Sequence, residues 1–397
     1  MTMKYAIVLP DGAADDPVKA LNGATPLEVA HIPHMDEIAR TGRCGRVVTV
    51  PPGFLPGSDV ATMSLFGYNP EELYEGRAPL EAVAKGIKSD ADELIFRCNF
   101  VTLVDGCMED FTAGHIAQPE VERLIADLND ALSDLGCRFH AGVSYRNLMV
   151  GIPPDVGELR CTPPHDIPGL MVTDYLPAGA GAGWVREIMA RASALLDAHE
   201  VNLVRRDIGE NPATDIWLWG QGRYREFPRL TEQYGLRGAA IAAVDLIRGI
   251  AMLAGLDLIE VEGATGYLDT NYAGKGEAAV KALDEYDLVV IHVEAPDEAG
   301  HLGDVQEKIK AIEAVDAMVV GPILEKLRTF DEWRILVAPD HPTPVETKIH
   351  SSVPPPFCMA GTGVHSVHSR VFNEKATAES DFFVDPGYEL LEFFVKS

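Results

Sequence analysis

Apolar runs of strand length alternate with helical patterns in both terminal parts of this chain, and this alternation restricts the possible folds most strongly. The runs that read as buried strands are residues 5–10, 44–50, 288–293 and 334–339. The segments that read as helices are residues 33–41, 59–66, 238–254, 276–286 and 306–327. The alternation predicts a parallel, doubly wound α/β sheet, and such sheets bind ligands beyond the carboxyl ends of their strands.

The middle of the chain has a different pattern. From about residue 94 to residue 218, short alternating segments follow one another, and residues 178–183 are only alanine and glycine. We therefore expect a smaller inserted α/β (α+β) domain at residues 86–232. Residues 1–85 and 233–397 would form a discontinuous main domain, and a length of 397 residues agrees with two domains.

Carboxylate and imidazole side chains follow the expected strands. Asp11 directly follows the first apolar run, and Asp340 and His341 follow the last one. Asp297 and His301 come after the third run with a spacing of i, i+4. On a helix this spacing places both side chains on one face, where they would share a metal ion. All of these side chains would meet at the carboxyl edge of the predicted sheet.

Ser58 and His350 complete this set of residues. Ser58 follows Gly57 at the start of an expected helix, where backbone N–H groups would hold a phosphoryl group on the serine oxygen. Plainer interpretations exist for each fragment, namely a helix N-cap, a strand-end turn or an exposed polar face. Together, however, the fragments supply the ligands of a two-metal site beside a serine nucleophile. Oxygen and imidazole ligands without thiolate suit Mn²⁺, Mg²⁺, Zn²⁺ or Co²⁺.

Charge and cysteine content exclude several classes of function. The chain has 33 basic and 61 acidic residues, a net charge of −28, which argues against nucleic acid or an anionic membrane as partner. Six scattered cysteines without a C-x-x-C pair predict neither a disulfide framework nor a thiolate zinc site. The longest apolar stretch is interrupted by Asp245 and Arg248, so we expect no membrane span. The N-terminus shows no signal-peptide pattern, and we expect a cytoplasmic protein.

Long and particular strings of residues extend over nearly the whole chain. They include Thr25-Pro-Leu-Glu-Val-Ala30, Pro56-Gly-Ser-Asp-Val-Ala61, Tyr74-Glu-Gly-Arg-Ala-Pro-Leu80, Arg97-Cys-Asn-Phe100, Ile216-Trp-Leu-Trp-Gly-Gln-Gly222 and Gly263-Ala-Thr-Gly-Tyr-Leu-Asp-Thr-Asn-Tyr272. In these strings the chain resembles the cofactor-independent phosphoglycerate mutases of the archaeal type, a branch of the alkaline phosphatase superfamily.

This resemblance implies an alkaline-phosphatase-like fold and the interconversion of 3-phosphoglycerate and 2-phosphoglycerate in glycolysis and gluconeogenesis. It implies two divalent metal ions, Mn²⁺ before Mg²⁺, Zn²⁺ or Co²⁺, and no 2,3-bisphosphoglycerate. Ser58 would carry the phosphoryl group as phosphoserine between the two hydroxyls of glycerate. The resemblance assigns Asp297, His301 and His350 to one metal, and Asp11, Ser58, Asp340 and His341 to the other.

The resemblance also implies residues that contact the substrate. His115 or Asp166 would act as acid or base on the glycerate hydroxyls. Arg146 would clamp a carboxylate or phosphate with its planar guanidinium, and Lys275 would neutralise phosphoryl oxygens. An ordinary surface salt bridge is the plain alternative for each. The remaining candidates for substrate contact are His165, Arg237 and Arg205.

Three other functions remain open from the sequence. Some relatives of this branch have been proposed as homoserine kinases, and they share the string around Ser58. A kinase must place ATP, and Gly274-Lys275-Gly276 lacks the spacing of a P-loop, although metals could hold nucleotide phosphates directly. A plain phosphatase would admit water to phospho-Ser58. A non-catalytic binding protein would have lost a ligand or the serine, whereas all these positions are filled. The sequence does not define the oligomeric state.

Overall fold

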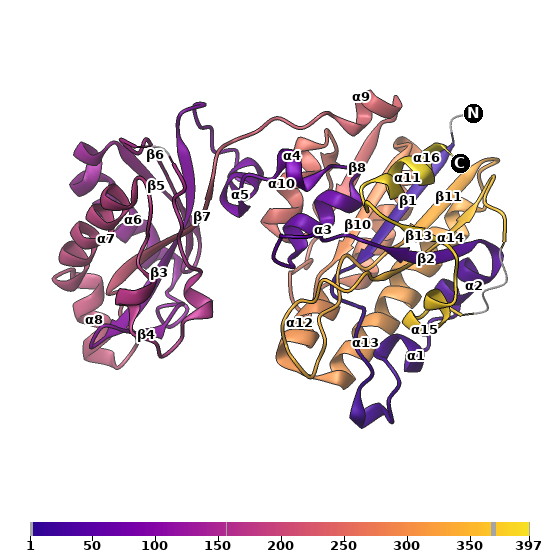
Figure 1. Cartoon of the computed structure of the whole chain (residues 1–397), viewed down its shortest axis with the longest axis horizontal. Coiled ribbons are helices and arrows are strands. Elements are labelled where there is room, and N and C mark those ends of the chain that lie inside the picture. Colours follow the sequence, from indigo (N-terminus) through magenta and orange to yellow (C-terminus); the bar gives the residue numbers. More distant parts are fainter. Residues whose placement is uncertain (1–2, 156, 367–370, 397) are drawn as a thin grey trace. The chain divides into compact units, whose positions relative to one another are not determined.

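The structure is a computed structural model that describes residues 3–155, 157–366 and 371–396. The chain divides into two compact units, each with its own sheet (Figure 1). Unit 1 comprises Met1–Tyr74 and Glu226–Ser397, and unit 2 comprises Glu75–Arg225.

The borders between the units differ from those predicted after residues 85 and 232. Helix α5 (Arg77–Ala84) belongs to unit 2, because its Ala78 and Ala82 are buried against Ile95 and Val150 of that unit's sheet. Its sequence alone does not say which apolar surface it covers. The second border also lies earlier in the chain than predicted, after residue 225 instead of residue 232.

Unit 1 contains an eight-stranded sheet with the order β13-β2-β12-β11-β1-β10-β8-β9. Strand β1 pairs in parallel with β10 and β11, and only β12 runs antiparallel to its neighbours. This arrangement confirms the predicted α/β class with a mostly parallel sheet. The strands are β1 (Lys4–Pro10), β2 (Arg43–Val47), β8 (Gly238–Ile241), β9 (Asp257–Leu258), β10 (Leu288–Val293), β11 (Trp333–Val337), β12 (Pro356–Gly361) and β13 (Phe383–Val384).

Helices cover both faces of this sheet, which explains the long apolar runs of its central strands β1 and β10. On β1, Ala6 and Val8 pack into the core with α2, α11, α13 and α14, whereas Tyr5 faces α16, with its ring 5.7 Å from that of Phe394. The helices of unit 1 are α1 (Pro26–Val29), α2 (Pro33–Thr41), α3 (Ser58–Leu65), α4 (Pro70–Leu73), α9 (Leu230–Tyr234), α10 (Asp245–Leu253), α11 (Tyr272–Glu285), α12 (Ala295–Leu302), α13 (Val305–Val315), α14 (Gly321–Leu327), α15 (Glu374–Ala378) and α16 (Glu389–Lys396), with short helical turns at Lys19–Leu21 and Asp316–Val320.

The predicted helix at residues 238–254 is wrong in its first part. Gly238–Ile241 is strand β8, which pairs in parallel with β10, and the helix α10 begins only at Asp245. A short run of glycine, alanine and isoleucine has no period that separates strand from helix. The neighbouring strand β10 supplies the hydrogen bonds that decide the matter.

Unit 2 is built on a five-stranded sheet in which β3 (Leu94–Val104) pairs antiparallel with β4, β6 and β7. Helices α6 and α7 pack on one face through residues such as Leu124, Val185 and Ile188. The other elements are β4 (Cys107–Asp110), β5 (Cys137–Val143), β6 (Arg146–Gly151), β7 (Asp215–Gly222), α6 (Gln118–Leu132), α7 (Ala182–Asp197), α8 (Glu200–Ile208) and short helical turns at Ser133–Leu135, Pro164–Asp166 and Val172–Tyr175.

Two expectations about the whole chain can be compared with these elements. Within the described residues, none of the helices has the length and apolar character needed to cross a membrane. All six cysteines are free thiols.

A buried ion pair anchors the loop that follows β1. The ammonium of Lys308 on α13 lies 2.7 Å from the carboxylate of Asp15 and also donates to the carbonyls of Ala14 and Thr343. Lys308 has no exposed surface, and the side chain of Asp15 is 1% exposed. Lys308 thereby joins the loop after β1 to the loop after β11, and these two loops carry Asp11 and His341.

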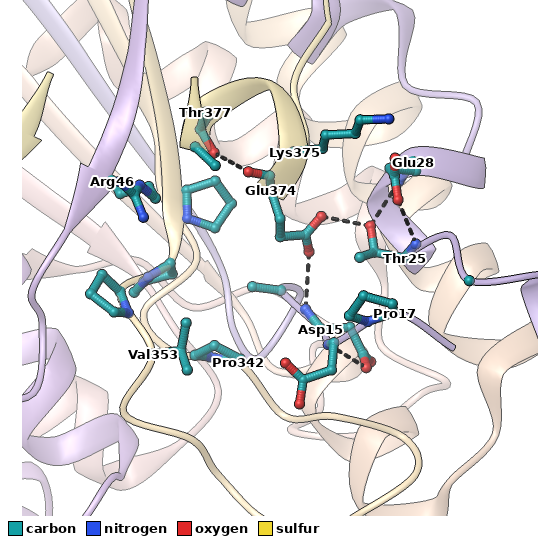
Figure 2. A pocket seen from close by; sticks show the side chains of 17 residues that line it. Asp15, Pro17, Thr25, Glu28, Arg46, Pro342, Val353, Glu374, Lys375 and Thr377 are labelled. Atoms are coloured by element: carbon teal, nitrogen blue, oxygen red, sulfur yellow. Dashed lines mark hydrogen bonds between the residues drawn. The ribbon is translucent and has the colours of Figure 1, made fainter. Parts of the chain in front are cut away.

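A cavity of about 420 Å³ lies against the same loop in unit 1. Figure 2 shows the Glu374 carboxylate reaching into it between Thr25 and the backbone of Asp15. One oxygen of Glu374 accepts from the Asp15 N–H at 3.0 Å, and the other accepts from the Thr25 hydroxyl at 2.6 Å. Burial raises the pKa of Glu374 to about 7, despite these hydrogen bonds. Arg46 and Lys375 also line the cavity.

Replacing Lys308 should reveal how much the buried pair stabilises unit 1. We expect Lys308→Met to lower the free energy of unfolding by about 3–5 kcal/mol, because it leaves the Asp15 carboxylate buried without its charged partner. Urea denaturation would measure the change. Lys310→Met is the matched control, since Lys310 is exposed and pairs with Glu307 on the surface, and it should change the value by less than about 0.5 kcal/mol. Equal effects of both variants would contradict this role.

Glu374 should make the stability depend on pH. Its folded-state pKa of about 7 lies above its ordinary value of 4.5, so the folded protein keeps this proton to higher pH than the unfolded chain. The resulting stabilisation is complete below pH 4.5 and is lost as the pH rises through 7. Relative to wild type, Glu374→Gln should therefore gain stability between about pH 5 and about pH 8 in urea denaturation. Glu379→Gln, an exposed position after the same helix, controls for the loss of one negative charge. A pH-independent difference would contradict the assignment.

Candidate metal centre

The candidate ligands of unit 1 gather at the carboxyl edge of its sheet. Asp11 follows β1, and its backbone N–H donates to the carbonyl of Val293, the last residue of β10. Asp297 lies in the first turn of α12, which begins two residues after β10, and Asp340 follows β11. Because β1 pairs in parallel with both β10 and β11, these three strand ends meet at one edge.

Asp297, His301 and His350 form a first group of potential ligands, with one atom of each within 4.8 Å of the others. Nε2 of His301 lies 3.1 Å from Oδ2 of Asp297, and Nε2 of His350 lies 3.4 Å from Oδ1. The two Nε2 atoms are 2.8 Å apart. The structure thus brings together the three residues that the sequence predicted for one metal ion.

The hydrogen bonds of these two histidines decide where their lone pairs point. Nδ1 of His301 lies 2.9 Å from the carbonyl oxygen of Lys348, and Nδ1 of His350 lies 3.3 Å from that of Pro56. A carbonyl oxygen only accepts, so in the neutral ring each Nδ1 carries the hydrogen and each Nε2 presents a lone pair. Two lone pairs 2.8 Å apart repel unless a cation lies between them. This group therefore fits a metal ion.

Asp11, Asp340 and His341 form a second group, and none of the three has exposed surface. Nε2 of His341 lies 3.5 Å from an oxygen of each carboxylate. These same oxygens, Oδ1 of Asp11 and Oδ2 of Asp340, have no hydrogen-bond partner among the described residues. The other oxygen of Asp340 accepts from the N–H groups of Gly12 and His341. Buried carboxylate oxygens without a donor are costly, so this group also fits a cation.

Ser58 lies beside this second group. It is the first residue of α3, it is 5% exposed, and its Oγ is 3.2 Å from Nε2 of His341. Gly57 precedes it, where a Cβ would lie only 2.7 Å from Oδ1 of Asp59. Asp59 is itself fixed by the Tyr74 hydroxyl at 2.5 Å. The serine oxygen thus lies at a helix start, where free N–H groups favour a phosphoryl group.

Thr343 connects the two groups, and the sequence analysis missed it. Its hydroxyl lies 2.5 Å from Oδ1 of Asp297 and 3.2 Å from Nδ1 of His341. A carboxylate accepts, so the hydroxyl donates to Asp297 and accepts from Nδ1–H of His341. The Nε2 of His341 therefore also presents its lone pair to the site. The rings of His341 and His350 are 4.2 Å apart between centroids, so the groups adjoin.

The site concentrates negative charge in a buried place. Burial and then the charge of Asp340 raise the pKa of Asp11 well above its ordinary range. Burial, with the charge of Asp297, raises the pKa of Glu294 to about 8. Burial would also raise the pKa of Asp297, but the two histidines of its group, when protonated at both ring nitrogens, donate from Nε2 and hold that pKa well below the ordinary range. Divalent cations are the groups that neutralise such a cluster.

His292 and Glu294 at the end of β10 were also missed. Nε2 of His292 lies 2.8 Å from Oδ2 of Asp11 and 3.6 Å from an oxygen of Glu294, and the three residues form a third group of potential ligand atoms. Burial lowers the pKa of His292 to about 4. The available signal was a histidine near the end of an otherwise apolar strand.

Two predicted substrate residues of unit 1 are not members of the ligand groups. Lys275 on α11 is fully buried, and its ammonium donates to the backbone carbonyl of His292 at 3.0 Å. Burial lowers its pKa to about 8. Arg237 directly precedes β8, with its guanidinium over the ring of Tyr286. This position is at the amino edge of the parallel sheet, opposite the ligands, so the structure does not bring Arg237 to the site.

Four of the five predicted residues of unit 2 are neighbours within that unit. The ring of His115 lies 5.8 Å from that of Tyr145, whose hydroxyl accepts from Nε of Arg146 at 3.0 Å. The ring of Phe111 packs against both Tyr145 and His165, with centroid distances of 6.4 Å and 6.3 Å. Nε2 of His165 is 3.7 Å from a carboxylate oxygen of Asp166, and both side chains are well exposed.

Arg205 of unit 2 is buried and bonded to other residues of the protein, which is typical of a residue that stabilises the fold. It is 2% exposed and donates to the Glu120 carboxylate at 2.7 Å and to the carbonyls of Asn211 and Ala113, each at 2.9 Å. Its guanidinium is thus occupied by protein oxygens. It holds the loop that leads to His115.

Comparisons with known proteins agree with this site. A family model described as 2,3-bisphosphoglycerate-independent phosphoglycerate mutase matches residues 39–202. The 2,3-bisphosphoglycerate-independent phosphoglycerate mutase of Methanothrix thermoacetophila is 49% identical over 394 residues, which cover 99% of this chain and 100% of that protein. The protein of the same name from Methanosarcina mazei is 47% identical over 397 residues, with 100% of both chains covered.

Solved structures share the fold. A protein from Pyrococcus horikoshii has a TM-score of 0.83 at 30% identity, with 99% of this chain and 97% of that chain covered. The cofactor-independent phosphoglycerate mutase from Thermoplasma acidophilum has a TM-score of 0.67 at 25% identity, with 100% and 99% covered. The relatives described here that carry a functional name are mutases, which supports the mutase over the homoserine kinase alternative. The identity over full length shows that the chain belongs to the 2,3-bisphosphoglycerate-independent phosphoglycerate mutase family.

Proposed function

We propose that this protein interconverts 3-phosphoglycerate and 2-phosphoglycerate through a phosphoserine at Ser58, without 2,3-bisphosphoglycerate. The observation that carries the proposal is the position of the Ser58 hydroxyl, 3.2 Å from His341 in a centre built of two ligand groups. A buried serine side chain beside two carboxylates that each have one oxygen without a hydrogen-bond partner among the described residues is an arrangement that suits phosphoryl transfer. Membership of the mutase family supports the substrate.

Two divalent metal ions would complete this centre, with Mn²⁺ as our first choice and Mg²⁺, Zn²⁺ or Co²⁺ as alternatives. When bound, they would lower the pKa of the serine hydroxyl and balance charge on the transferring oxygens. The residues that we assign to one ion are Asp297, His301 and His350, and those that we assign to the other are Asp11, Ser58, Asp340 and His341.

The chain's own groups would carry the phosphoryl group in two steps. Oγ of Ser58 would lose its proton to solvent before the reaction and attack the phosphorus of 3-phosphoglycerate as the alkoxide, while the oxygen that leaves takes a proton from His115 or Asp166. The glycerate then reorients, and its other hydroxyl takes the phosphoryl group back while the same residue accepts the proton. We assign to Arg146, with His165, the task of holding the carboxylate during this reorientation.

A phosphoserine that water reached would make the enzyme a phosphatase. The exposed fraction of Ser58 is 5%, which supports a site that limits access of water. Lys275 would supply positive charge next to the centre, since its ammonium is buried and donates to the backbone carbonyl of His292. Six free cysteines suit a reducing compartment, and we propose the cytoplasm as the location.

A coupled assay tests the reaction and its metal dependence together. We expect chelator-stripped protein to be inactive and Mn²⁺-reconstituted protein to form 2-phosphoglycerate from 3-phosphoglycerate without added 2,3-bisphosphoglycerate. Homoserine with ATP is assayed beside it. Phosphohomoserine formation without mutase turnover would overturn the substrate while keeping the centre. Full turnover of stripped protein would overturn the metal dependence.

Removing the proposed nucleophile should abolish turnover but not folding. Ser58→Ala should lower kcat on the order of 10⁶-fold, the size of the loss when another serine enzyme loses its nucleophile. Metal content by elemental analysis should remain close to that of wild type, because the other ligands stay in place. Ser64→Ala is the matched control on the same helix, since the Ser64 hydroxyl only donates to backbone carbonyls. Substantial mutase activity of Ser58→Ala would exclude the phosphoserine step.

A further inference from the structure

Asp11 uses its two carboxylate oxygens in different ways. Oδ2 lies 2.8 Å from Nε2 of His292, whereas Oδ1 has no hydrogen-bond partner among the described residues and lies 3.5 Å from Nε2 of His341. One oxygen is therefore turned toward the sheet and the other toward the second ligand group. The partner of Oδ2 is His292.

The hydrogen on the His292 ring can be located from its surroundings. Its Nδ1 is buried and has no hydrogen-bond partner within the described part of the chain. A hydrogen on Nδ1 would leave that donor unpaired and set the lone pair of Nε2 against a carboxylate oxygen 2.8 Å away. When Asp11 is ionised, as binding of a metal ion requires, a hydrogen on Nε2 makes a charge-assisted bond to it and leaves only an acceptor unpaired, which costs less.

This tautomer is the reverse of the one found in the other histidines of the centre. His301, His350 and His341 each give the Nδ1 hydrogen to an oxygen and present a lone pair at Nε2. Those three histidines are therefore oriented to bind a metal ion through Nε2. His292 presents an N–H group instead, although its ring atoms lie close enough to Asp11 and Glu294 to resemble a further metal site.

The backbone holds His292 and Asp11 in fixed relation. His292 pairs with Leu9 across the parallel strands β10 and β1, so the two side chains project from adjacent strand ends. The carbonyl of His292 accepts from the ammonium of Lys275, and the N–H of Asp11 donates to Val293. Neither residue can shift along its strand without breaking these bonds.

We propose that His292 is a positioning residue that orients the Asp11 carboxylate, so that Oδ1 alone is offered to the metal ion of the second group. The inference rests on the metal dependence in the proposed function. Loss of such a supporting hydrogen bond typically weakens metal affinity about 10–100-fold. The effect should be largest in the group of Asp11, Asp340 and His341, because the hydrogen bonds and ion pairs given for the His292 ring within the described residues go to Asp11 and Glu294 and not to the first group.

Two substitutions of similar size separate the donor from the bulk of the ring. In His292→Gln the amide nitrogen takes roughly the place of Nε2 and still donates to Asp11. In His292→Asn the amide lies near the position of Nδ1 and does not reach. Chelator-stripped wild type and both variants are titrated with Mn²⁺ by calorimetry, and circular dichroism confirms folding. We expect His292→Asn to weaken one of two sites by about 10–100-fold, with the other unchanged and His292→Gln close to wild type.

Each other outcome has a distinct meaning. Wild-type affinities in His292→Asn, or equal loss at both sites in both variants, would overturn the positioning role. Three equivalents in wild type, one of them absent in His292→Asn, would overturn it in favour of a direct ligand. If His292→Asn does not fold, His292→Gln decides, since loss of a site there overturns the role and retention of both sites supports it. Wild type that binds no Mn²⁺ would overturn the metal dependence itself.

Discussion

Parallel strands that end side by side force the carboxylates that follow them into one buried space, and the candidate site depends on how this charge is balanced. Asp11, Asp297 and Asp340 are at most 3% exposed. Burial and repulsion raise the pKa of Asp11, whereas hydrogen bonds from protonated histidine rings lower the pKa of Asp297. The fold can keep such groups together only with histidines and, as we propose, metal ions among them.

The surrounding groups determine which atom of each ligand faces the centre. Backbone carbonyls of Lys348 and Pro56 fix two histidines, and the Thr343 hydroxyl fixes the third. His292 fixes Asp11 in a similar way, except that its hydrogen lies on Nε2 and is donated to the ligand Asp11. None of these contacts joins neighbours in the sequence except that of Thr343, so the orientation of the ligands is a property of the packed sheet edge.

Local pattern was sufficient for much of the fold and of the ligand set. Strands β1, β10 and β11 are buried on both faces, and their continuous apolar runs were readable without a structure. Local pattern failed at β8, which is too short to show a period, and at α5, whose small apolar face fits either unit. It also failed for Arg237, because residue type does not reveal which edge of the sheet a residue occupies.

The sequence by itself determined the strand–helix alternation and the residue types that follow the strands. Both depend on the periodicity and spacing of residues that are near one another in the chain. Only the tertiary structure decided the pairing of β1 with β10 and β11, and hence which side chains meet. It also decided that His292 donates while His341 offers a lone pair. The chemical role of an imidazole depends on which oxygen lies beside each nitrogen, and residues far away in the chain supply most of these oxygens.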